Sequence, residues 1–68
     1  MDDEVFNLSL RKFLKTVGVS SQREIEQAVA KALASGGLAG NAALPATMTL
    51  EIPQLTLRIT FHGELKLQ

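Results

Sequence analysis

The sequence has 68 residues, no cysteine, and seven basic against seven acidic residues. This length allows one small domain, and the lack of cysteine excludes disulfides and thiolate metal sites. The even charge balance argues against nucleic-acid binding as the main role, because nucleic-acid binders carry a basic excess. The acidic start MDDE precedes no long apolar run, so we expect a cytoplasmic protein with neither a secretory signal nor a membrane span.

Residues 3–17 are predicted to form an amphipathic helix. Acidic residues stand at the start of this segment and basic residues near its end, which complements the helix dipole. Gly18 is predicted to end the helix, because glycine adopts the left-handed conformation of a helix cap at little steric cost. Apolar side chains recur at spacings of three and four, which places them on one stripe of a helix: Phe6, Leu10, Phe13, Leu14 and Val17.

A second helix is predicted to begin at Ser21, which forms a capping-box pattern with Glu24. The Gly36-Gly37 pair is predicted to end it, so that residues 3–36 form a helical hairpin. The apolar stripe of this second helix consists of Ile25, Ala28, Val29, Ala32 and Leu33.

The turn between the two predicted helices, Gly18-Val19-Ser20, resembles the turn of a DNA-binding helix-turn-helix. In that pattern a buried aliphatic residue follows the glycine by six positions, where this sequence has Glu24. Ile25 stands one position later, a rotation of about 100° on a helix. We therefore interpret the turn as a connection between two packed helices. Nucleic-acid binding stays as an alternative, through a basic group made of Arg11, Lys12, Lys15 and Arg23.

Residues 37–46 are small and nearly uncharged and show neither helical nor strand periodicity, so they are predicted to form a connecting loop. From Thr47 onward, apolar and polar residues alternate, which is typical of strands with one buried face. Residues 47–52 and 55–61 are predicted to pair through a two-residue turn at Pro53-Gln54. In that register Leu50 faces Leu57, and Glu51 faces Thr56 on the polar side.

A third strand is predicted over residues 64–68, after a three-residue loop or a bulge at His62 to Glu64. The predicted fold is therefore α+β with the order ααβββ. Two helices cover one face of a three-stranded antiparallel meander that spans residues 47–68. The predicted core consists of Phe6, Leu10, Phe13, Leu14, Val17, Ile25, Val29, Leu33, Leu50, Ile52, Leu57, Ile59 and Phe61.

The leading functional hypothesis is a small non-enzymatic module that associates with itself or with another protein. A domain this small buries little of its surface and has no disulfide to stabilise it. The edge strand Thr47 to Ile52 is one candidate for pairing with a second chain. The candidate partner surface combines Leu8, Arg11 and Lys15 on the first helix with the polar sheet face: Thr49, Glu51, Thr56, Arg58 and Thr60.

A third and weaker hypothesis is an enzyme or a small-ligand protein that uses His62, the only histidine. Catalysis would need a carboxylate such as Glu64 to orient the imidazole, and a pocket beside it. One imidazole also supplies too few ligands for a zinc site. We therefore expect no enzymatic activity, no metal and no cofactor.

The sequence also resembles a family of short bacterial proteins, found mainly in proteobacteria, that is known as a domain of unknown function. The resemblance covers most of the chain, and its most recognisable parts are SQREIE at residues 21–26 and the segment LPATMTLEIP at residues 44–53. It implies a bacterial cytosolic protein. It implies no activity and no functional residues.

Overall fold

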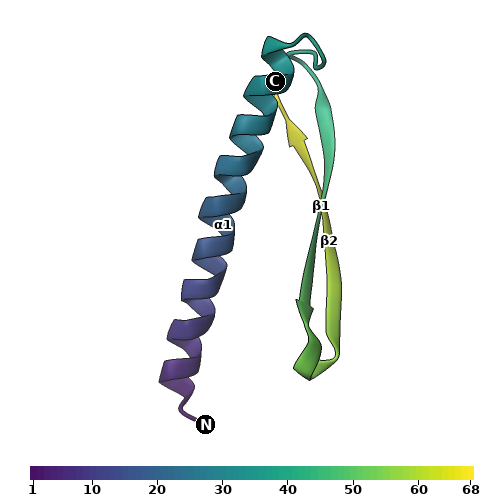
Figure 1. Ribbon diagram of the computed structural model, residues 1–68. Helices are drawn as coiled ribbons and strands as arrows, with labels where there is room; N and C mark the ends of the chain where they lie inside the picture. Colours follow the sequence, from purple (N-terminus) through teal and green to yellow (C-terminus); the bar gives the residue numbers. More distant parts are fainter. The chain divides into compact units, whose positions relative to one another are not determined.

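The structure is a computed structural model that describes all 68 residues, Met1–Gln68. The chain divides into two units, Met1–Gly37 and Leu38–Gln68. The first unit contains one α-helix, α1 (Asp3–Ala34). The second contains strands β1 (Ala43–Ile52) and β2 (Leu57–Lys66), joined by the short 3₁₀ helix η1 (Pro53–Leu55) (Figure 1). The α+β class is confirmed, but the predicted order of two helices and three strands is wrong.

Helix α1 runs without a break through Gly18, which corrects the predicted helical hairpin over residues 3–36. A glycine inside a helix costs only about 1 kcal/mol relative to alanine, which the hydrogen bonds of the surrounding turns outweigh. Ser21 does not cap a second helix. Its hydroxyl donates to the carbonyl oxygen of Val17, one turn earlier, as the Thr16 hydroxyl donates to the carbonyl of Lys12 at 2.9 Å. Each bond joins residues four apart, which lie one turn from each other only where the helix is continuous.

The two ends of α1 are capped by residues that the sequence indicates. The Asp2 carboxylate accepts hydrogen bonds from the backbone N–H groups of Glu4 and Val5 at 3.0 and 3.1 Å. At the other end Gly36 has φ +76°, the left-handed conformation that glycine adopts without strain. Its N–H donates to the carbonyl of Leu33, and the N–H of Gly37 donates to that of Ala32. These two bonds form a Schellman motif.

The second unit is a two-stranded antiparallel hairpin with a longer turn than predicted. Ile52 pairs with Leu57, and Leu50 pairs with Ile59. The chain turns through η1 and Thr56, whose φ of 50° is left-handed. The predicted two-residue turn at Pro53-Gln54 is therefore wrong, and the register moves by two residues. Because side chains alternate with a period of two, a shift of two leaves every residue that remains in a strand on its predicted face, whereas Leu55 and Thr56 move into the turn.

The predicted third strand is absent, because β2 continues through His62 and Gly63 to Lys66. Its partners come from residues 43–46, which were predicted to be loop and instead form the first part of β1. Gly63 pairs with Ala46, and Leu65 pairs with Leu44. A turn at residues 62–64 would remove these pairs, whereas continuing the strand keeps both the hydrogen bonding and the alternation.

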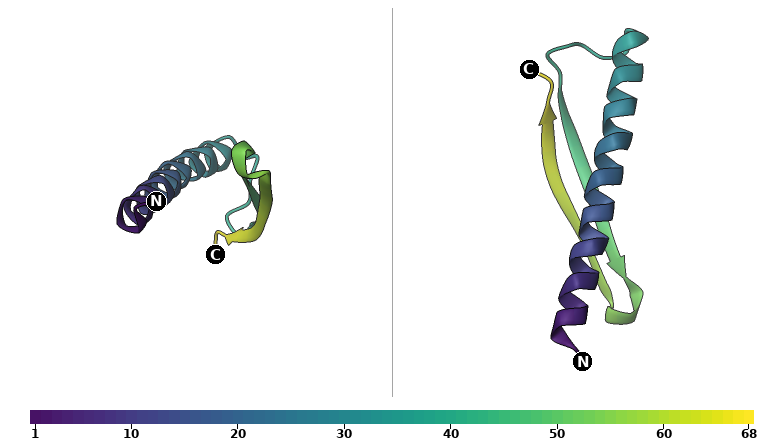
Figure 2. Two further views of the ribbon diagram at one scale, coloured as in Figure 1. Left: turned by 90° about the horizontal axis from the view of Figure 1, so that it is seen from below. Right: turned by 90° about the vertical axis from the view of Figure 1, so that its left-hand side faces the viewer.

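The hairpin has one apolar face and one polar face, and its two strands twist about each other along their length (Figures 1 and 2). Two-stranded ribbons twist more strongly than wider sheets. Five cross-strand pairs make up the apolar face: Leu44–Leu65, Ala46–Gly63, Met48–Phe61, Leu50–Ile59 and Ile52–Leu57. Another five make up the polar face: Ala43–Lys66, Pro45–Glu64, Thr47–His62, Thr49–Thr60 and Glu51–Arg58.

No side chain of either unit is buried, so neither unit forms a core of its own. Val17, Val29 and Leu50 are half-buried, and the other ten residues of the predicted core are exposed. Phe6 keeps 51% of its surface exposed and Phe61 keeps 55%. The reason is architectural: a single helix and a two-stranded hairpin each bury one stripe or face only when another layer packs on it.

Candidate interaction surfaces

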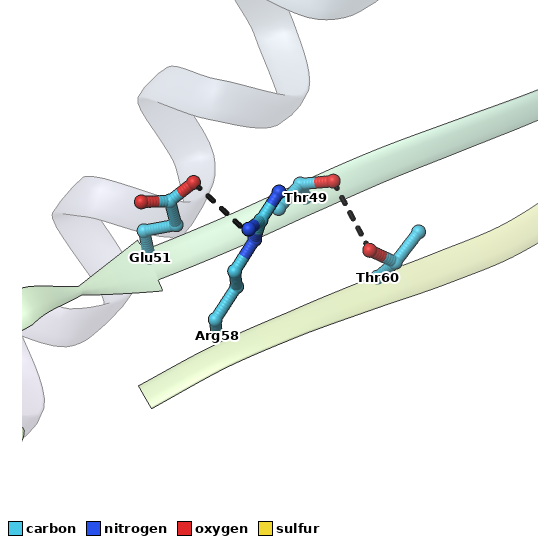
Figure 3. Close-up of polar contacts among 4 residues, drawn as sticks. All are labelled: Thr49, Glu51, Arg58 and Thr60. Carbon is cyan, nitrogen blue, oxygen red and sulfur yellow. Dashed lines mark hydrogen bonds and ion pairs between the residues drawn. The ribbon is translucent and has the colours of Figure 1, made fainter. Parts of the chain in front are cut away.

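The polar face of the hairpin holds four of the predicted partner-surface residues (Figure 3). The Thr49 and Thr60 hydroxyls lie 3.1 Å apart in a cross-strand hydrogen bond. The Arg58 guanidinium Nε lies 3.6 Å from Glu51 Oε1 in an ion pair. These contacts come from the observed register, in which Arg58 rather than Thr56 stands opposite Glu51. Thr56 lies outside the strands, at the end of the turn.

The ion pair on this face is open to solvent, with the Arg58 side chain 75% and the Glu51 side chain 57% exposed. Exposed pairs of this kind typically contribute about 0.2–1 kcal/mol. Four polar side chains of this face are therefore paired across the strands, and the face offers a partner little apolar area.

The apolar face of the hairpin is a stronger candidate for a contact surface. It is built from both strands and contains large side chains that are exposed, among them Met48, Ile59 and Phe61. The sequence analysis identified its central part and missed its far end, which is formed by Leu44, Ala46 and Leu65. The sequence does indicate that the strand begins earlier, because Leu44 and Ala46 continue the period-two alternation of residues 47–52.

Helix α1 carries the second apolar surface, a stripe that contains both predicted helical stripes. Leu8, Arg11 and Lys15 of the predicted partner surface lie on another side of the helix, away from Phe6 and Leu10, and their spacings of three and four place them together there. Leu8 is 62% exposed. A shallow depression on the same helix is lined by Lys15, Thr16, Val19 and Ser20. A depression formed by one helix alone cannot enclose a ligand.

His62 lies on the polar face of β2, exposed and opposite Thr47, with Glu64 two residues along the same face. No hydrogen bond or ion pair orients the imidazole, so the carboxylate–imidazole arrangement of the third hypothesis is not formed. No three His, Asp or Glu side chains come close enough together to hold a metal ion. None of the chain's helical segments combines the length and the apolar character that crossing a bilayer requires.

Comparisons with known proteins place the chain in a family. A search of curated proteins and a search of solved structures each found no match. A family model described as "Family of unknown function (DUF6494)" matches residues 1–68, the whole sequence. The resemblance to a domain of unknown function that the segments around residues 21–26 and 44–53 indicate is thereby confirmed. The chain belongs to the DUF6494 family.

Proposed function

We propose that this protein is a small, non-enzymatic module that associates with itself and covers its apolar surfaces in the assembly. One observation supports the proposal most strongly: 46% of the residues are hydrophobic, yet none is buried in either unit. Fully burying a side chain of the size of leucine or phenylalanine contributes roughly 1.5–3 kcal/mol. With more than ten such side chains exposed, covering them provides a large driving force for association.

The architecture of each unit supports the same proposal. An isolated two-stranded hairpin is marginally stable in water. Helices in proteins likewise gain most of their stability by packing an amphipathic face. The formal net charge of zero also means that two copies meet little long-range repulsion. A cytoplasmic setting, which the cysteine-free composition favours, belongs to the same proposal.

The test is the mass of the protein in solution, measured by native mass spectrometry and by light scattering across a hundredfold range of concentration. We expect a species of at least twice the 7.3 kDa chain. A 7.3 kDa monomer at every concentration, with a cooperative unfolding transition, would show that the chain covers its own apolar surfaces and would refute the proposal.

Two neighbouring residues of β1 provide matched variants. Leu50 lies on the apolar face and Thr49 on the polar face. Leu50→Lys is expected to destabilise the assembly by about 2 kcal/mol, the contribution of one buried leucine. Thr49→Lys adds the same charge to the polar face and is expected to leave the mass of the assembly unchanged. Equal effects of the two substitutions would show that the apolar face of the hairpin is not covered in the assembly.

A further inference from the structure

We infer that two copies of the chain pair antiparallel along the outer edges of their β2 strands, about a two-fold axis at Phe61, and so form a four-stranded sheet. This inference rests on the proposed self-association and adds the edge, the orientation and the register. Three features of the hairpin support it: the outward backbone groups of β2, the proline in β1, and the order of charges along β2.

The free edge of β2 presents a regular series of backbone groups that have no partner within the chain. The N–H of Leu67 donates to the carbonyl of Ala42, its opposite residue when the strand register is continued by one pair. Such hydrogen-bonded pairs alternate with pairs whose N–H and C=O groups point away from each other. An added strand could therefore bond to the outward groups of five residues of β2: Arg58, Thr60, His62, Glu64 and Lys66.

The outer edge of β1 is less suited to this pairing. By the same alternation, its outward groups include those of Pro45, Thr47 and Thr49. Proline has no N–H, so a strand that pairs with β1 over its whole length loses one hydrogen bond. The backbone therefore favours β2 over β1, the strand that contains the edge suggested by the sequence alone.

Polarity limits the registers that two β2 strands can adopt. Directly opposite residues place their side chains on the same face of a sheet. In β2 the even-numbered residues lie on the polar face and the odd-numbered residues on the apolar face, so even residues must face even residues. Two registers that meet this condition give the longest overlap within the strand, the first over residues 57–65 and the second over residues 58–66.

Charge distinguishes these two registers. In the first, the two-fold axis passes between the two copies of Phe61, and Arg58 lies opposite Glu64 of the second copy. In the second, Arg58 lies opposite Lys66 instead. Opposite charges across strands stabilise a sheet and like charges destabilise it, and the two-fold axis makes each contact occur twice. The register centred on Phe61 is therefore favoured.

Glu64 has no ion pair within its own chain. Arg58 Nε lies 3.6 Å from Glu51 Oε1 (Figure 3), whereas Glu64 stands opposite Pro45. In the paired sheet Arg58 lies between two carboxylates, that of Glu51 in its own chain and that of Glu64 in the second copy. The second copy thus supplies a cation to a carboxylate that lacks one.

The same register joins the apolar faces of the two hairpins. Phe61, which is exposed in the single chain, lies beside Phe61 of the second copy, so each ring covers part of the other. Ile59 lies opposite Gly63 of the second copy, where a Cβ would meet nothing within 4 Å. A sheet of three or more strands with an apolar face also meets a condition for stability that a two-stranded hairpin does not.

Cysteine cross-linking tests the edge and the register directly, because the chain contains no cysteine of its own. Thr60→Cys and His62→Cys are made as separate variants, mixed, and oxidised under mild conditions. In the proposed register residue 60 lies opposite residue 62 of the second copy, with Cα atoms about 5.5 Å apart, which a disulfide can bridge. The two copies of either residue are offset along the strands and lie roughly 9 Å apart, beyond that reach. We expect dimers that join one variant to the other at several times the yield from either variant alone.

Thr47→Cys and Thr49→Cys are the matched control pair on the outer edge of β1. Within the hairpin Thr47 stands opposite His62 and Thr49 opposite Thr60, all on the polar face. In the proposed sheet Thr47 and Thr49 of the second copy are three strand spacings apart, roughly 14 Å. Their mixture is expected to give no more cross-linked dimer than each variant alone. Efficient cross-linking of this pair would place the pairing on β1 and would overturn the inference.

The other outcomes separate this inference from the proposed function. More dimer within Thr60→Cys alone or within His62→Cys alone than in their mixture would show a different register. No cross-linking in a sample whose native mass is twice that of the chain would place the interface on another surface. Either result overturns the proposed pairing and leaves self-association intact. A monomeric native mass overturns both.

Charge exchange provides a second measurement that does not depend on cysteine. Arg58→Glu and Glu64→Arg are each expected to raise the dimer dissociation constant roughly threefold to tenfold, because each places like charges opposite one another at two symmetric positions. An equimolar mixture of the two variants should restore association, since every facing pair is then opposite in charge. Failure of the mixture to associate better than the separate variants contradicts the register.

Glu51→Arg is the control for Arg58→Glu. It breaks the ion pair within the hairpin in the same way, but residue 51 lies on β1 and does not face the second copy in the proposed sheet. It is expected to change the dissociation constant less than about twofold. An equal rise for Glu51→Arg and Arg58→Glu would show that the effect comes from the hairpin itself and would contradict the pairing at β2.

Discussion

Helix α1 and the β-hairpin differ in how far apart along the sequence their hydrogen-bonded partners lie. In α1 every hydrogen-bonded partner is within a few residues. A residue that favours a helix end, such as Gly18, breaks the helix only if its effect outweighs the hydrogen bonds of the turns on both sides of it. In the hairpin, partners such as Ala43 and Lys66 are brought together by a single turn. An error in the length of that turn changes every pair at once. The comparison teaches that sequence patterns determine faces more reliably than they determine breaks and registers.

The substitution with the largest expected effect tests the continuity of α1. Gly18→Pro removes a backbone donor in the middle of the helix and clashes with the preceding turn, at a cost of about 3 kcal/mol or more. We expect a marked loss of helical circular dichroism. Asp3→Pro is the control, because the first position of a helix accepts proline. Unchanged helicity in Gly18→Pro would support two helices with a turn at Gly18 instead.

A smaller effect is expected at the end of α1, where two adjacent glycines differ in conformation. Gly36 has a positive φ, whereas Gly37 does not, and a Cβ at Gly37 meets only ordinary contacts at 3.6 Å and beyond. Gly36→Ala is expected to lower the free energy of unfolding by about 1–2 kcal/mol, the cost of a left-handed conformation for an L-residue. Gly37→Ala should change it little. Thermal unfolding followed by circular dichroism measures both, and equal effects would contradict the Schellman cap.

The smallest expected effect concerns the register of the hairpin. A double-mutant cycle with Glu51→Ala and Arg58→Ala should give a coupling free energy of about 0.2–1 kcal/mol that decreases as salt is added. The predicted two-residue turn would instead couple Glu51 to Thr56, for which Glu51→Ala and Thr56→Ala form the matching cycle. Coupling in the second cycle and none in the first would show that the register is wrong by two residues.

Much of the fold could be predicted from local patterns. The start of the helix at Asp2, its end near Gly36 and the polar and apolar sides of residues 47–61 all follow from side-chain chemistry and periodicity. The break at Gly18 could not be judged in this way. Glycine and the Ser21-Glu24 pattern are compatible with a cap, but a hydroxyl can equally donate to the carbonyl one turn earlier, as the Ser21 hydroxyl does.

The predictions of a third strand and of a buried core were wrong for a different reason. Whether residues 43–46 form loop or strand depends on whether residues 63–66 are available to pair with them, and that is a property of two distant segments together. The predicted core combined side chains of both units, and neither unit has a buried side chain of its own. Periodicity identifies which side chains are apolar on one face, but it contains no information about which molecule covers that face.

The candidate surface was predicted in part. Thr49, Glu51, Arg58 and Thr60 share one face as expected, because their positions differ by even numbers within each strand. Thr56 was misplaced together with the turn. The far end of the apolar face was missed at Leu44 because the small residues around it suggested a loop, and Leu65 was assigned to a separate third strand.

Pro45 in β1 has a consequence for what larger assemblies this protein can form. In a two-stranded sheet each strand has one free edge, and such edges can recruit further strands without limit into fibrils. Proline has no backbone N–H, and β1 accommodates it because only one of its sides is paired. The outer edge of β1 therefore lacks a donor near the start of the strand. A strand that adds to the outer edge of β1 therefore loses one backbone hydrogen bond at Pro45, so sheet growth is less favourable there than along the outer edge of β2, which contains no proline.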